Sequence, residues 1–201
     1  TPENDFPASS NFRAITFGPG AGAFTLLGNG ITMAGHLTNN SGSLQTMNLP
    51  LSIASGRYVA TLDGDLTLGG AISGNGGLHL IGSGKTTLTA RNTYTNYTYV
   101  NGGMLILPEG GAINNRYNFI VGQNAGHNGA LYVKGGSITN SQVSNTGNFM
   151  VGRAGFGSME FTSGSIRANT VYIGWTGGFG TAVIDGGSFY CGTGSDYMVI
   201  G

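Results

Sequence analysis

The chain has 201 residues, of which 39 are glycine, and its 8 basic and 8 acidic side chains give a net charge of zero at pH 7. Charged residues make up 8% of the chain and hydrophobic residues 39%, which is the opposite of the balance in disordered segments. Because there is no Lys/Arg cluster and no apolar run near the roughly 18 residues of a membrane span, we expect neither nucleic-acid binding nor membrane insertion.

Short β-strands are predicted along the whole chain, and helices are not. Glycine interrupts most eleven-residue windows, and each glycine costs a helix interior ~1 kcal/mol relative to alanine. The predicted strands carry Val, Ile, Leu, Thr, Tyr or Phe and end in Gly, Asn, Asp or Ser. In chain order they cover residues 14–17, 23–27, 65–70, 78–82, 86–90, 93–100, 104–107, 118–122, 130–136, 159–165, 169–174, 181–187 and 197–201.

Two short phrases repeat in the C-terminal half. An apolar residue, then Val or Ile, then glycine, closes at Gly122, Gly152, Gly174 and Gly201. A Gly-Ser-apolar phrase follows the first three, starting at Gly136, Gly164 and Gly187. A unit of about 20–30 residues with two or three short strands has the size of one β-solenoid coil. The nearly constant offset between the phrases therefore predicts stacked coils.

A β-solenoid also explains the composition. Each coil lies about 4.8 Å from the next, and alternate side chains enter a thin core, so long apolar runs are unnecessary. Gly, Asn and Asp supply the corners. A propeller requires a period near 40 residues, and a sandwich requires no repeated phrases, so both fit less well. We predict an all-β solenoid of roughly eight to nine coils, about 40 Å long.

Residues 71–107, AISGNGGLHLIGSGKTTLTARNTYTNYTYVNGGMLIL, resemble the autotransporter-associated β-strand repeat. The resemblance implies a right-handed parallel β-helix at or outside a bacterial cell surface, without catalytic residues. The chain departs from the family at His79 and at Asn96-Tyr97, where the family has Gly-Gly at a corner. We expect one solenoid over residues 1–201, with N-terminal coils in 1–66, the repeat in 67–116 and glycine-rich coils in 117–201. The matching residues are Ile72, Ser73, Gly74, Gly76, Gly77, Leu78, Gly82, Gly84, Leu88, Asn92, Thr93, Tyr94, Thr95, Val100, Asn101 and Gly103.

Three aromatic residues are candidates for ligand binding. If Val100 points inward, Tyr97 and Tyr99 share the outward face of their strand, where exposed rings stack on sugars or on a neighbouring protein. Trp175 follows an apolar-glycine corner. Structural alternatives stay open for all three, because tyrosines also fill the solvent side of strands and Trp175 fits a lid over the core or a loop anchor.

We predict no catalytic, metal or cofactor site. A polysaccharide lyase or hydrolase requires converging carboxylates, with or without a basic residue. Only Asp63 and Asp65 stand close together in the body of the chain, and turn formation explains them better. Cys191, the single cysteine, fits a buried or half-buried packing position, and its spacing to histidines is unlike that of a metal site.

The sequence therefore favours a non-catalytic extracellular structural β-solenoid, acting as a bacterial surface passenger or stalk, an adhesin, or a fibre subunit. The alternative is a carbohydrate-binding or carbohydrate-active β-helix protein, which requires a row of exposed aromatic rings or a cluster of acids. Two kinds of partner are expected. Open coil edges favour end-to-end self-association, and the tyrosines favour glycans.

Overall fold

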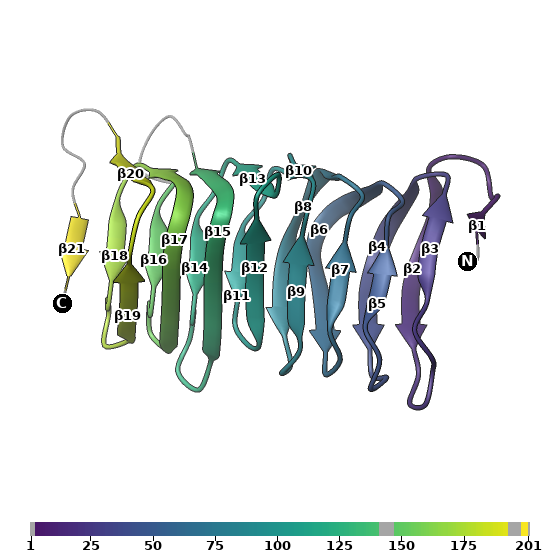
Figure 1. Ribbon diagram of the computed structural model, residues 1–201, viewed down its shortest axis with the longest axis horizontal. Helices are drawn as coiled ribbons and strands as arrows, with labels where there is room; N and C mark the ends of the chain where they lie inside the picture. Colours follow the sequence, from purple (N-terminus) through teal and green to yellow (C-terminus); the bar gives the residue numbers. More distant parts are fainter. Residues whose placement is uncertain (1–2, 141–146, 193–197, 201) are drawn as a thin grey trace.

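The computed structural model describes residues 3–140, 147–192 and 198–200, and within these ranges the chain winds as a parallel β-solenoid (Figure 1). Every strand pair in its two sheets is parallel. The three ranges contain no helix, and hence none long and apolar enough to cross a membrane. The first strand, β1 (Glu3–Asn4), and the last, β21 (Met198–Ile200), lie at opposite ends of the stack (Figure 1).

One sheet has nine strands, one for each successive coil. Nine stacked strands make eight steps, which confirms the predicted all-β solenoid of roughly eight to nine coils. In stacking order the strands are β2 (Ser10–Phe17), β4 (Ile31–Asn39), β6 (Leu51–Leu62), β8 (Ile72–Ile81), β11 (Thr98–Val100), β14 (Phe119–Val121), β16 (Phe149–Val151), β18 (Val171–Ile173) and β21 (Met198–Ile200).

The other sheet has twelve strands and covers the remaining sides of the coils. Its strands are β1 (Glu3–Asn4), β3 (Thr25–Gly28), β5 (Gln45–Met47), β7 (Leu66–Leu68), β9 (Lys85–Leu88), β10 (Arg91–Asn92), β12 (Met104–Pro108), β13 (Ala112–Asn115), β15 (Asn128–Asn140), β17 (Phe156–Ala168), β19 (Phe179–Ile184) and β20 (Ser188–Cys191).

Long strands pass a corner of the coil without ending. The first part of β15 pairs with β12 and its last part with β13, and the register shifts between them next to Gly135. Gly135 has φ +92°, a left-handed conformation that glycine adopts without a side-chain penalty. β17 turns in the same way at Gly164, where φ is +104°. The coils that contain β15 and β17 therefore have three sides, and glycine provides the bend between two of them.

The core is a set of inward rows, one residue per coil. One row joins Leu80, Val100, Val121, Val151 and Ile173 by direct register, and each of these side chains is at most 6% exposed. Burial of each such side chain contributes about 1.5–3 kcal/mol. Because each coil adds only one residue to a row, the short apolar bursts of the sequence are enough to build the core.

A column of glycines brings two sides of the coil close together. Gly129, Gly157 and Gly180 pair with one another in register across three coils. A Cβ atom at Gly157 would lie 2.6 Å from the carbonyl oxygen of Val121 and closer still to the amide nitrogen of Gly152. No side chain fits there, which explains part of the high glycine content.

Both repeated phrases mark equivalent positions of successive coils. Val121, Val151 and Ile173, each just before the glycine of the first phrase, pair in one row. The serines of the second phrase, Ser137, Ser165 and Ser188, pair in another. Gly201 lies outside the described residues. The subdivision into residues 1–66, 67–116 and 117–201 remains an interpretation of the sequence.

Candidate functional site

A row of large side chains points outward from the nine-stranded sheet. Register joins His79, Tyr99, Ile120, Met150 and Tyr172, one residue from each of five successive coils. Their neighbours along each strand, such as Val100 and Val121, belong to the inner core, so strand alternation places this row on the opposite face. We call these five residues the outer row.

The middle of the outer row is buried although it lies outside the main core. Tyr99, Ile120 and Met150 are only 4%, 2% and 2% exposed. They form a second apolar cluster, against which Tyr97 and Tyr172 pack at the margins. This cluster is the floor of a surface groove.

The walls of the groove come from residues on both sides of this floor. Tyr97, Asn118 and Asn148 lie two residues before the floor residues of their coils, and Arg153 and Trp175 lie in the loops after β16 and β18. Backbone hydrogen bonds place these loops, because Arg153 N donates to Gly122 O at 3.0 Å and Trp175 N to Gly152 O at 2.9 Å. The walls and floor enclose an open hollow of about 260 Å³.

Aromatic rings stand at both ends of the groove. At one end Tyr97 stacks on Tyr99 with 5.4 Å between ring centroids, and Tyr117 lies 5.0 Å from Tyr97. At the other end Tyr172 stacks on Trp175 at 4.7 Å, and the guanidinium carbon of Arg153 lies 5.9 Å from the Trp175 ring centroid. The cation over the indole face is a cation–π contact.

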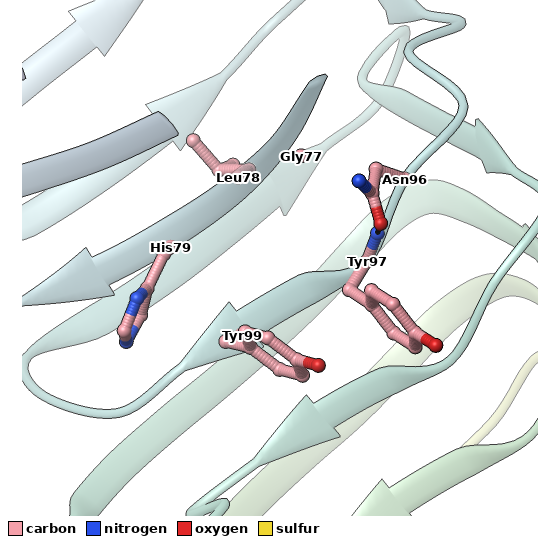
Figure 2. A pocket seen from close by; sticks show the side chains of 6 residues that line it. All are labelled: Gly77, Leu78, His79, Asn96, Tyr97 and Tyr99. Atoms are coloured by element: carbon pink, nitrogen blue, oxygen red, sulfur yellow. Dashed lines mark hydrogen bonds between the residues drawn. The ribbon is translucent and has the colours of Figure 1, made fainter. Parts of the chain in front are cut away.

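The corner that carries Tyr97 is built from backbone contacts. Tyr97 O accepts a hydrogen bond from Leu78 N at 3.0 Å, and the Asn96 side chain accepts one from Tyr97 N at 2.8 Å. Figure 2 shows the rings of Tyr97 and Tyr99 side by side, with His79 on the far side of Tyr99. Gly77 lies beneath this corner, and a Cβ there would be 2.5 Å from Tyr97 O. A glycine in the coil below therefore makes room for the non-glycine corner.

A group of polar side chains links His79 to the next two coils. Asn101 is 5% exposed, and its side-chain nitrogen lies 2.6 Å from His79 Nε2 and 3.2 Å from Gln123 Oε1. Its side-chain oxygen accepts a hydrogen bond from Gln123 N at 3.0 Å. The side-chain amide of Asn101 thus connects three successive coils and helps to hold their strands in register.

One of the comparisons with known proteins found a similar sequence in a bacterial adhesin. The chain is 32% identical over 162 residues to the adhesin BmaC autotransporter of Brucella suis biovar 1 (strain 1330). That alignment covers 79% of this chain but only 5% of the much longer adhesin. This similarity and the parallel solenoid together fit a surface β-helix protein.

Two further comparisons gave no match. No model of a known protein family matches the chain, so the assignment of residues 71–107 to the autotransporter-associated repeat remains a prediction. No solved structure matches it either.

The structure brings the three predicted aromatic residues to one place. Tyr97, Tyr99 and Trp175 all line the same groove. Tyr97 is half-buried and Trp175 is 39% exposed, but Tyr99 is 4% exposed. The expectation that both tyrosines are exposed is therefore wrong for Tyr99, because Tyr97 and the neighbouring coils cover its ring.

Sequence reasoning missed the rest of the groove, although a signal was present. Ile120 and Met150 occupy the middle of the phrases FIVG and FMVG, and Tyr99 occupies the same place in TYVN. Extending the first phrase back by one coil would have aligned all three. The same alignment places Asn118 and Asn148 two residues before the middle position of their phrases. It places Arg153 three residues after the middle position.

The other candidate residues lie in structural positions. Asp63 and Asp65 are exposed in the turn between β6 and β7, where an Asp65 carboxylate oxygen accepts a hydrogen bond from Lys85 N at 2.9 Å. Cys191 is half-buried and packs against the core. Over the described ranges, no three His, Cys, Asp or Glu side chains are grouped so as to hold a metal ion.

Proposed function

We propose that this chain is a structural, non-catalytic segment of a bacterial cell-surface adhesin, in which the solenoid serves as a stiff passenger or stalk. The observation that carries the proposal is the continuous parallel pairing of the nine-stranded sheet, in which each strand from β2 to β21 is hydrogen-bonded to the next. A stack hydrogen-bonded along its whole length resists bending and holds each outward side chain at a fixed height. The similarity to the Brucella suis adhesin supports a location at the cell surface.

The distribution of acidic groups supports a scaffold role over an enzyme. A glycoside hydrolase requires two carboxyl groups about 5–9.5 Å apart across the scissile bond, in a groove that holds the sugar. The groove described above is lined by aromatic, amide and apolar residues and by Arg153. The two adjacent acids, Asp63 and Asp65, lie on exposed turn positions instead.

Surface labelling tests the proposal. An antibody raised against the purified chain is expected to stain intact cells of the source organism, and external protease is expected to remove the stain. A cytoplasmic protein serves as the control for intact membranes. Staining that appears only after permeabilisation would overturn the surface location. An in-frame deletion of the segment that leaves cell adhesion unchanged, while the remaining protein reaches the surface, would overturn the adhesin role.

End-to-end self-association is a second part of this proposal. Ile184 and Ile200 stand in register with the core residues Phe161 and Ile173, yet they are 48% and 75% exposed. A following coil or a second copy stacked on this end would cover both side chains, and in the isolated chain only a second copy is available. In sedimentation velocity, the sedimentation coefficient of the chain should then rise with protein concentration. Ile184→Lys should reduce this rise. A coefficient that does not change with concentration would contradict association.

A further inference from the structure

The groove over the outer row leaves five aromatic or polar side chains accessible to a ligand. Its apolar floor is only 2–4% exposed, so the floor leaves little room for the apolar side chains of a peptide. The groups that remain accessible are the half-buried ring of Tyr97, the 39% exposed ring of Trp175, the half-buried amides of Asn118 and Asn148, and the guanidinium of Arg153.

The aromatic rings are spaced along the solenoid axis. Three coil steps separate the coil of Tyr99 from that of Tyr172, which places Tyr97 and Trp175 about 14 Å apart along the axis. Each ring is held by two packed neighbours, Tyr97 by Tyr99 and Tyr117, and Trp175 by Tyr172 and the Arg153 guanidinium. Rings fixed in this way lose little conformational freedom when a flat ligand stacks on them.

Planar amides lie between the two rings. Asn118 and Asn148 come from neighbouring coils, and the side-chain oxygen of Asn118 accepts a hydrogen bond from Asn148 N at 3.0 Å. This bond orients the Asn118 side chain along the groove. Amide groups both donate and accept hydrogen bonds, as the recognition of sugar hydroxyls requires.

The charge of the groove selects for an anion. Among the described lining residues Arg153 is the one charged side chain, and a carboxylate is absent from the lining. Arginine binds carboxylates through two parallel hydrogen bonds. The chain as a whole has zero net charge, which argues against a polyanion such as a nucleic acid that requires many phosphate contacts.

We propose that this groove binds an acidic oligosaccharide that lies along the solenoid axis. The sugar rings pack against the exposed parts of the Tyr97 and Trp175 rings, their hydroxyls bond to Asn118 and Asn148, and a carboxylate pairs with Arg153. The inference deepens the proposed function. It rests on that function only for the location of the chain, because a segment at the cell surface meets glycans. Binding itself is a property of the isolated chain and is tested without cells.

The test is a glycan array probed with the purified 201-residue chain. The array carries oligosaccharides with uronic or sialic acids beside neutral counterparts of the same length, and these arms identify the acidic sugar. We expect acidic members to bind at least tenfold more tightly than their neutral counterparts, with weaker binding at high salt. Equal binding of acidic and neutral members, or no binding, would overturn the proposal. Capture from a peptide library in place of glycans would also overturn it.

Matched variants assign the binding to the groove. Arg153→Gln is expected to abolish the preference for acidic members, whereas Arg167→Gln removes the same charge from an exposed position on β17 and should leave it intact. Trp175→Ala is expected to weaken all binding about tenfold, and Trp175→Phe to restore most of it. Tyr190→Ala, at a 53% exposed tyrosine on β20, is the aromatic control. Circular dichroism confirms that each variant is folded.

The outcomes separate this inference from the proposed function. If intact cells are labelled but Arg153→Gln and Trp175→Ala bind the array like the parent chain, the groove assignment fails and the surface role stands. If the array result holds but labelling requires permeabilised cells, the surface role fails and the binding site stands.

Discussion

Tyr97 and Tyr99 stack with 5.4 Å between their ring centroids and 13° between their planes, yet they differ in exposure. Tyr99 is 4% exposed and also meets His79 edge to face at 5.6 Å, whereas Tyr97 is half-buried at the rim of the groove. One ring therefore belongs to the packed outer row, and the other lies over it.

This difference predicts unequal effects of truncation. Tyr99→Ala should lower the free energy of unfolding by about 3 kcal/mol, because it opens a cavity in a packed cluster. Tyr97→Ala should cost about 1 kcal/mol, since part of that ring is already in water. Urea unfolding of both variants measures the two values. Equal losses would show that Tyr99 is as exposed as Tyr97.

The sequence was sufficient to predict the solenoid because the repeated phrases fall on paired positions. Ser137, Ser165 and Ser188 could be aligned from the sequence alone, and they pair in the structure. The N-terminal coils lack these phrases, so the strands β4 (Ile31–Asn39) and β6 (Leu51–Leu62) were not predicted. Register shifts interrupt the pairing of β4 with β6, which obscures their alternation in the sequence.

The groove was only partly predictable for a related reason. Tyr97 and Tyr99 are neighbours in sequence, and parity placed them on one face. Arg153 and Trp175 join them only because loops of different lengths return the chain to equivalent positions of successive coils. The burial of Tyr99 depends on Ile120 and the next coils, and a single strand carries no information about them.

The glycine column offers a test of close backbone approach. Gly157→Ala should lower the free energy of unfolding by about 3 kcal/mol, because its Cβ would overlap backbone atoms of Val121 and Gly152 that have no rotamer to change. Gly22→Ala is the control, since no atom lies within 4 Å of its added Cβ, and it should change stability by less than about 0.5 kcal/mol. Thermal or urea unfolding compares the two. Similar stabilities would mean that the two sides of the coil are farther apart at Gly157.

Tyr94 predicts an alkaline limit to stability. Its side chain is fully buried, and its hydroxyl lies 2.7 Å from Thr98 Oγ1. Burial raises the pKa of Tyr94 well above its usual value, and the hydrogen bond to Thr98 offsets only part of that rise. The unfolded chain releases this proton near pH 10, while the folded chain retains it. The stability contributed by Tyr94 is therefore complete below about pH 10 and is lost as the pH rises further, by up to about 1.4 kcal/mol per pH unit.

Tyr94→Phe isolates this contribution. The variant should lose about 1 kcal/mol at neutral pH through the missing hydrogen bond, and its stability should decline less steeply above about pH 10. Tyr117→Phe, which removes the hydroxyl from a 39% exposed ring, is the control variant. Urea midpoints at a series of pH values provide the measurement. Identical slopes in all three proteins would exclude Tyr94 as the source.

Removing one whole coil tests the stacking itself. Val100 and Val121 are partners in register, so deletion of residues 101–121 joins Val100 to Gly122 at the equivalent point of the next coil. The shortened chain should fold cooperatively, with a urea m value lower by about one-eighth, because one coil less is exposed on unfolding. Deletion of residues 101–111 removes only part of a coil and brings inward positions to the wrong side of the sheet, so it should abolish cooperative unfolding. If both deletions behave alike, the coils are not the repeating unit of stability.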